Sequence, residues 1–172
     1  MTTERIAPSE LWIVGYGNTQ RRDDGIGPYV VGRLHEILGD GKNIHFRTVY
    51  QLDPCLAEEL QHAAELVLVD ATLSRLEDGW EWAEIQPESG SIPYTTHHFK
   101  PSFLLRILDS LYHRSPRTWV ASVQGEDFGF GEGVSPEAER RAEKAISEIA
   151  ERFATKEIDK KDESVRLYEK GV

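Results

Sequence analysis

The sequence has one cysteine, fewer basic than acidic residues, and no long hydrophobic segment. Cys55 has no partner for an internal disulfide, as is usual in a reducing cytosol. We expect Cys55, which follows Pro54 at a predicted helix start, to be a small packed residue rather than a reactive thiol. No stretch resembles the apolar core of a signal peptide or reaches the length of a membrane span. We therefore expect a cytoplasmic protein that has no membrane partner.

The chain carries 20 Lys and Arg against 30 Asp and Glu, a formal net charge of −10. Binding to nucleic acid or to an anionic membrane surface needs a concentrated basic face, so this charge argues against both partners. The length of 172 residues fits one domain that can bury a sufficient core without disulfides.

Short apolar runs alternate with segments of helical spacing along the first 154 residues. Strands are predicted at 11–14, 43–50, 66–69, 80–85 and 117–123, and helices begin near positions 26, 54, 101 and 136. The alternating, partly polar stretch 80–85 is typical of an edge strand. The pattern predicts an α/β fold, a three-layer sandwich whose twisted and mostly parallel central sheet is flanked by helices. We expect one domain over 1–154 and a charged, solvated tail over 155–172 that need not be ordered.

The stretch 11–34 combines a strand, a glycine turn, a polar loop and a helix. Such a unit often forms a site at the carboxyl edge of an α/β sheet. Gly15 and Gly17 also begin like a dinucleotide-binding G-x-G-x-x-G motif, but the third glycine is replaced by Gln20. The acidic pair Asp23-Asp24 would repel a pyrophosphate, so a nucleotide-binding module is the weakest interpretation.

Acidic and imidazole side chains follow these elements. If the first and third strands are parallel neighbours, Asp24 and Asp70 face one crevice. We assume, without support from the strand pattern, that the loop holding His97 and His98 also lies at this edge. Such a set can bind a divalent metal such as nickel or zinc, or perform acid–base chemistry. The residues can also be unrelated surface groups.

Several motifs occur in order along 10–152. They are G-x-G-N at 15–18, D-[DE]-x-x-G at 23–27, V-D-A at 69–71 and T-H-x-x-x-P-x-x-L-L at 96–105, followed by the glycine-rich segment 123–135. With these motifs the chain resembles the maturation endopeptidases of [NiFe] hydrogenases, most of all the branch serving bidirectional NAD(P)-linked hydrogenases. This resemblance implies an α/β domain with endopeptidase activity, which removes the C-terminal extension of the hydrogenase large-subunit precursor after nickel insertion.

The resemblance also implies site residues. Asp24, Asp70 and His97 would contact the nickel, with Asp24 and Asp70 as the catalytic candidates. Spacing back from Pro101 favours His97 over His98. The precursor would supply the nickel, and no organic cofactor is implied. An alternative is a metal-sensing assembly factor that binds the same precursor without cutting it. The adjacent Arg21 and Arg22 either pair with these acids or with substrate carboxylates, or are solvated loop residues.

Overall fold

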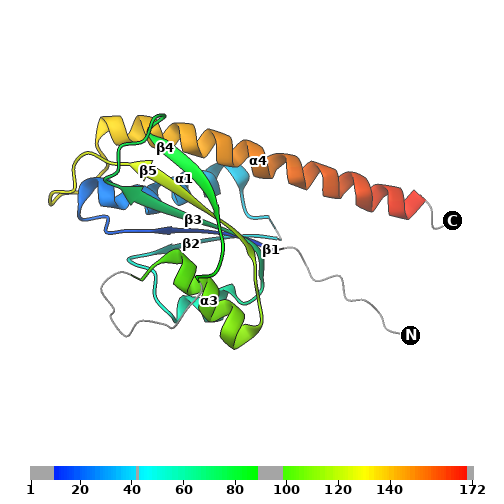
Figure 1. The fold of residues 1–172 in the computed structure, drawn as a ribbon. Coiled ribbons are helices and arrows are strands. Elements are labelled where there is room, and N and C mark those ends of the chain that lie inside the picture. Colours follow the sequence, from blue (N-terminus) through cyan, green and yellow to red (C-terminus); the bar gives the residue numbers. More distant parts are fainter. Residues whose placement is uncertain (1–9, 42, 89–98, 170–172) are drawn as a thin grey trace.

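The computed structural model describes residues 10–41, 43–88 and 99–169, with side chains up to residue 154. A five-stranded sheet of order β2-β1-β3-β5-β4 forms the centre of this described part (Figure 1). Its strands are β1 (Glu10–Tyr16), β2 (Ile44–Val49), β3 (Ala63–Thr72), β4 (Trp80–Ile85) and β5 (Arg117–Gln124). All neighbouring pairs are parallel except β4 with β5, which is antiparallel. The prediction of a mostly parallel sheet with 80–85 as an edge strand is confirmed.

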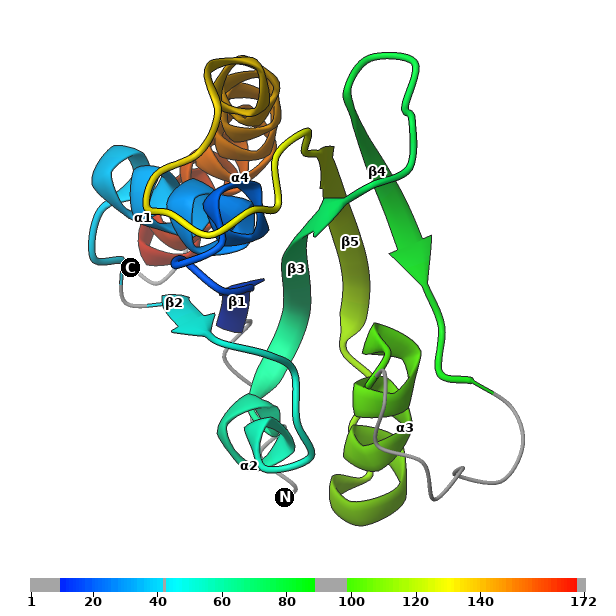
Figure 2. The ribbon, with the colours of Figure 1, turned by 90° about the vertical axis from the view of Figure 1, so that its left-hand side faces the viewer.

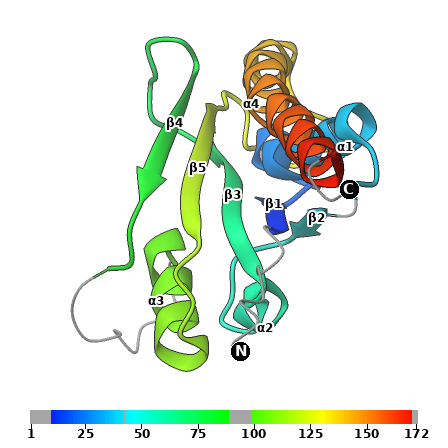
Figure 3. The same ribbon diagram turned by 90° about the vertical axis from the view of Figure 1, so that its right-hand side faces the viewer.

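Helices cover both faces of the sheet (Figures 2 and 3). One face packs against α1 (Ile26–Leu38) and α4 (Pro136–Glu169), and the other against α2 (Leu56–Leu60) and α3 (Pro101–Tyr112). The short 3-10 helix η1 (Arg22–Gly25) leads into α1. The predicted three-layer α/β sandwich is therefore confirmed.

The core follows from the alternation of side chains along each strand. In β1, Ile13 packs toward α1 and α4, whereas its neighbour Val14 packs toward α2 and α3. The run from Leu66 to Val69 in β3 is fully buried, as expected for a central strand covered on both faces. This central packing fixes the carboxyl ends of β1 and β3, where the candidate site lies.

One expectation differs from the structure. Cys55 is exposed rather than packed, because it lies just before α2 while the inward positions of that helix belong to Leu56 and Leu60. Residues 155–169 of the charged segment belong to α4, which continues through Glu169. In the described residues no helix has the length and apolar character of a membrane span.

Candidate functional site

Asp70 lies near the carboxyl end of β3, beside the end of β1. The parallel register pairs Gly15 with Val69, so Tyr16 and Asp70 follow at the same level of the sheet. The Tyr16 hydroxyl donates a hydrogen bond to the Asp70 carboxylate, which also accepts one from the backbone N–H of Ala71. Asp70 is half-buried. The first and third strands are thus parallel neighbours, as the shared-crevice hypothesis required.

The glycine turn after β1 brings Asp24 to the same edge. Gly17 has φ +139°, and a Cβ there would lie 1.9 Å from the carbonyl oxygen of Asp24, so this close approach requires glycine. The backbone N–H of Asn18 donates to Asp24 Oδ2 at 3.0 Å. Gly15 similarly allows α1 to approach β1, because a Cβ at this position would lie 2.2 Å from the Gly27 carbonyl oxygen. Both glycines therefore allow close backbone packing, Gly17 against Asp24 and Gly15 against Gly27.

Asp24 and Asp70 interact electrostatically. Burial raises the pKa of Asp70 to about 6, and the negative charge of Asp24 adds to this shift. The hydrogen bonds from Tyr16 and Ala71 oppose the shift by favouring the charged carboxylate. Burial and the neighbouring Asp70 also raise the pKa of Tyr16, which keeps its hydroxyl a donor. A carboxylate in this state can exchange a proton near neutral pH or gain from a nearby cation.

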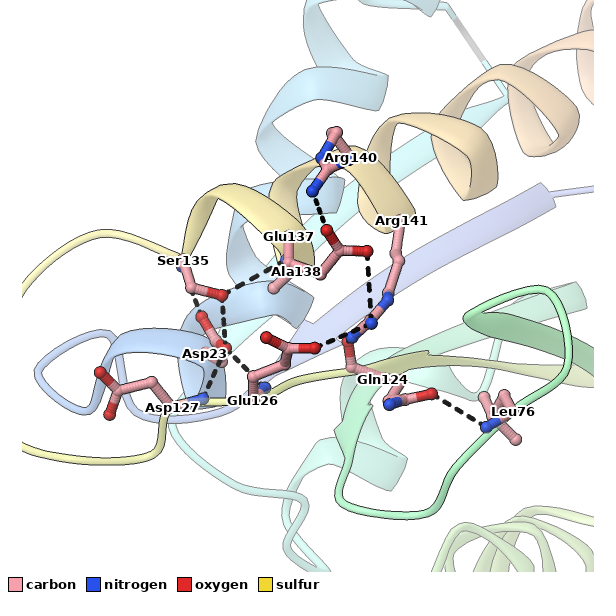
Figure 4. Close-up of polar contacts among 10 residues, drawn as sticks. All are labelled: Asp23, Leu76, Gln124, Glu126, Asp127, Ser135, Glu137, Ala138, Arg140 and Arg141. Atoms are coloured by element: carbon pink, nitrogen blue, oxygen red, sulfur yellow. Dashed lines mark hydrogen bonds and ion pairs between the residues drawn. The ribbon is translucent and has the colours of Figure 1, made fainter.

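Asp23 has a separate role that the sequence analysis missed. Its side chain is 0% exposed. It accepts hydrogen bonds from the backbone N–H groups of Glu126 (2.7 Å), Asp127 (2.9 Å) and Ser135 (2.6 Å), and from the Ser135 hydroxyl (2.8 Å), as Figure 4 shows. Ser135 Oγ in turn accepts a hydrogen bond from the Ala138 N–H and so caps the start of α4. Asp23 thus fastens η1 to the glycine-rich loop before α4.

The shift in the pKa of Asp23 reflects this role. Burial alone raises the pKa, but the hydrogen bonds from Asp127, Ser135 and Glu126 outweigh burial and lower it. The two adjacent aspartates therefore have different roles. The carboxylate of Asp23 accepts hydrogen bonds from the loop before α4, whereas Asp24 interacts electrostatically with Asp70. A serine directly before the predicted helix start at 136 is a common helix cap, and it does not identify Asp23 as a partner.

The two arginines before the acidic pair contact the same glycine-rich loop. Arg22 Nε lies 3.3 Å from Asp127 Oδ2, and Arg21 Nε donates to the carbonyl oxygen of Phe128 at 3.1 Å. Both arginines are exposed. Arg22 therefore pairs with a loop carboxylate rather than with the acids beside it.

Part of the predicted metal set cannot be placed. His97 and His98 lie outside the described residues, so the structure brings together only Asp24 and Asp70 of the three predicted ligands. Within the described ranges, no cluster of three His, Cys, Asp or Glu side chains could hold a metal ion. The described site is a pair of carboxylates with a tyrosine donor, and its histidine partner remains a prediction.

The sequence matches no family model, and no curated protein is significantly similar to it. Several solved structures share the fold. The [NiFe] hydrogenase maturation protease HycI from Thermococcus kodakarensis KOD1 is 22% identical, with a TM-score of 0.66 over 83% of this chain and 91% of its own. The hydrogenase maturating endopeptidase HybD from E. coli is 16% identical, with a TM-score of 0.66 over 81% and 89%. HybD from T. kodakarensis is 21% identical, with a TM-score of 0.62 over 84% and 99%. These similarities establish that the chain has the α/β fold of these maturation proteases.

Proposed function

We propose that this protein is an endopeptidase that removes the C-terminal extension of a [NiFe] hydrogenase large-subunit precursor after nickel insertion. The observation that carries the proposal is the electrostatic interaction of Asp24 with Asp70, near the carboxyl ends of parallel strands β1 and β3, on a fold shared with hydrogenase maturation proteases. The motif resemblance to the branch serving NAD(P)-linked bidirectional hydrogenases supports the choice of substrate.

Nickel in this proposal belongs to the precursor and acts as the recognition signal. Asp24 and Asp70 repel one another, and a cation presented between them relieves that repulsion. Carboxylate and imidazole are suitable nickel ligands, so His97 is proposed as the third contact. A precursor without nickel does not relieve the repulsion between the two carboxylates and therefore binds more weakly. The site thereby favours a precursor whose metal is already in place.

The chemistry proposed for the chain's own residues is proton transfer at Asp70. The ionised Asp70 carboxylate is proposed to accept a proton from an attacking water. The Tyr16 hydroxyl orients this carboxylate. Asp24, held by the Asn18 N–H, supplies the second negative charge that faces the substrate metal. No organic cofactor is part of this proposal, and the site of action is the cytoplasm.

The test is incubation with purified large-subunit precursor, with and without nickel, followed by intact mass measurement. Loss of one C-terminal peptide from the nickel-loaded precursor alone is the expected result. Tight binding without a change in mass would instead identify a non-cleaving, metal-sensing assembly factor. Cleavage that is equal with and without nickel would contradict the recognition role of Asp24 and Asp70.

A further inference from the structure

The loop between β5 and α4 presents an exposed aromatic side chain close to the candidate site. Phe130 is 88% exposed, although the loop around it is well fastened. Gly131 N–H donates to the Gln20 carbonyl at 2.9 Å, and Arg22 N–H donates back to the Gly131 carbonyl at 3.0 Å. Figure 2 looks onto this edge, with the loop in yellow beside the blue segment after β1. Phe130 is thus exposed from a loop whose backbone is held at several points.

The positively charged side chain of Arg21 lies over the Phe130 ring. The Arg21 guanidinium lies 5.7 Å from the centroid of Phe130 and is tied to the same loop through the Phe128 carbonyl. In the described part of the chain, no carboxylate forms an ion pair with Arg21. Aromatic and arginine side chains held in place are the residues that most often dominate the binding energy of protein interfaces. The hydrogen bonds that hold the loop backbone reduce the entropy that the loop loses on binding.

Arg22 also lines an apolar pocket. It has a volume of about 310 Å³. Its lining includes Thr19, Arg22, Gly25, Pro28, Tyr29 and Val134. Arg22 joins the two features, because its guanidinium also packs against Gly131, next to Phe130. Gly25, which lines the pocket, directly follows Asp24 in the sequence, although neither Asp24 nor Asp70 lines the pocket itself.

We propose that Arg21, Phe130 and this pocket form a docking surface for the precursor protein, an inference that rests on the proposed function. The segment that fits is apolar and carries a carboxylate. One of its apolar side chains fills the pocket, a second covers the Phe130 ring, and the carboxylate pairs with Arg21. This docking contact involves neither Asp24 nor Asp70. It therefore binds precursor whether or not nickel is present, whereas the two aspartates add affinity only for the nickel-loaded form.

The experiment is calorimetric titration of the full chain with nickel-loaded and nickel-free precursor. Phe130→Ala is expected to weaken the affinity for both forms by about tenfold or more, as truncation of an interface anchor does. Thr19→Trp, which places a ring at the pocket, should weaken both forms as well. Leu111→Ala is the matched control, since Leu111 is 70% exposed near the C-terminal end of α3. Its affinity should stay within about twofold of wild type.

The outcomes separate the docking surface from the proposed function. If wild type cleaves the precursor but Phe130→Ala binds it as Leu111→Ala does, the docking surface is wrong and the function stands. If Phe130→Ala weakens only the nickel-loaded form, the surface belongs to metal recognition and the inference fails. If sedimentation shows that wild type self-associates through Phe130, a second copy of the chain occupies the surface instead. Absence of both binding and cleavage by wild type would overturn the function and the docking surface together.

Discussion

Asp23 is buried and Asp70 is half-buried, and their surroundings shift the pKa values of the two carboxylates in opposite directions. Asp23 is enclosed by donors from the loop before α4, and its pKa is lowered despite burial. Asp70 has a tyrosine hydroxyl and one backbone N–H as donors and a second carboxylate nearby, so burial raises its pKa to about 6. A carboxylate such as Asp23, which accepts four hydrogen bonds, stabilises the fold. A carboxylate such as Asp70, which has few donors and a second carboxylate nearby, can bind a cation or accept a proton.

The largest expected effect is on stability at Asp23. Asp23→Ala leaves the backbone N–H groups of Glu126, Asp127 and Ser135 without their acceptor, so we expect roughly 3–4 kcal/mol of destabilisation. Urea unfolding followed by circular dichroism measures it. The control is Asp40→Ala, whose side chain is 93% exposed and which should change stability by less than about 0.5 kcal/mol. Equal effects of the two variants would contradict a fastening role for Asp23.

The next effect is on activity at Asp70. Asp70→Asn keeps the side-chain volume but removes the charge and the proton acceptor, so we expect processing of nickel-loaded precursor to fall by about 100-fold or more. Single-turnover cleavage, read by intact mass, measures the rate. The unfolding transition should stay cooperative, because Asp70 does not hold a loop as Asp23 does. Processing at the wild-type rate would remove Asp70 from the mechanism.

The two residues should also differ in how stability depends on pH. The Asp23 carboxylate has a lowered pKa, so it stabilises the fold above the unfolded-state pKa of about 4 and loses this contribution as the pH falls. Between pH about 4 and about 6 the folded protein holds a proton on Asp70 that the unfolded chain has released, so the Asp70 contribution weakens as the pH rises. The free energy of unfolding of Asp70→Asn, relative to that of wild type, should therefore be roughly 1–2 kcal/mol higher at pH 7 than at pH 4. Urea unfolding at both values measures this, and no gain would contradict the raised pKa of Asp70.

The smallest effect concerns Tyr16. Tyr16→Phe removes the hydroxyl that favours the charged form of Asp70, so the pKa of Asp70 should rise further. Carboxyl carbon NMR shifts followed through a pH titration report this change. The control is Tyr50→Phe, because the Tyr50 hydroxyl accepts a hydrogen bond from Asn18 rather than contacting Asp70. An unchanged titration of Asp70 in Tyr16→Phe would show that the hydroxyl does not hold the carboxylate.

The contrast between these residues also explains what the sequence could predict. The fold class and the position of Asp70 follow from strand patterns, because a buried apolar run that ends in an acid places that acid near the carboxyl edge of a parallel sheet. The edge position of β4 follows from its alternating aromatic and acidic residues.

Asp23 could not be recognised in the same way. Its partners lie 103 to 112 positions further along the chain, in a loop without any periodic pattern. Which of two adjacent aspartates turns toward that loop depends on the backbone path through η1, and composition does not encode this path. The exposure of Cys55 was missed for a similar reason, because the prediction placed it inside the helix start rather than before it.

The most direct test of the assignment is the nickel dependence of precursor binding in wild type and Asp70→Asn. Titration with nickel-loaded and nickel-free precursor gives a ratio of two affinities for each protein. If Asp24 and Asp70 recognise the metal, the wild-type ratio should exceed about tenfold and fall toward one in Asp70→Asn. An undiminished ratio in Asp70→Asn, with a cooperative unfolding transition, would contradict the assignment of the Asp24 and Asp70 pair as the nickel-recognising site.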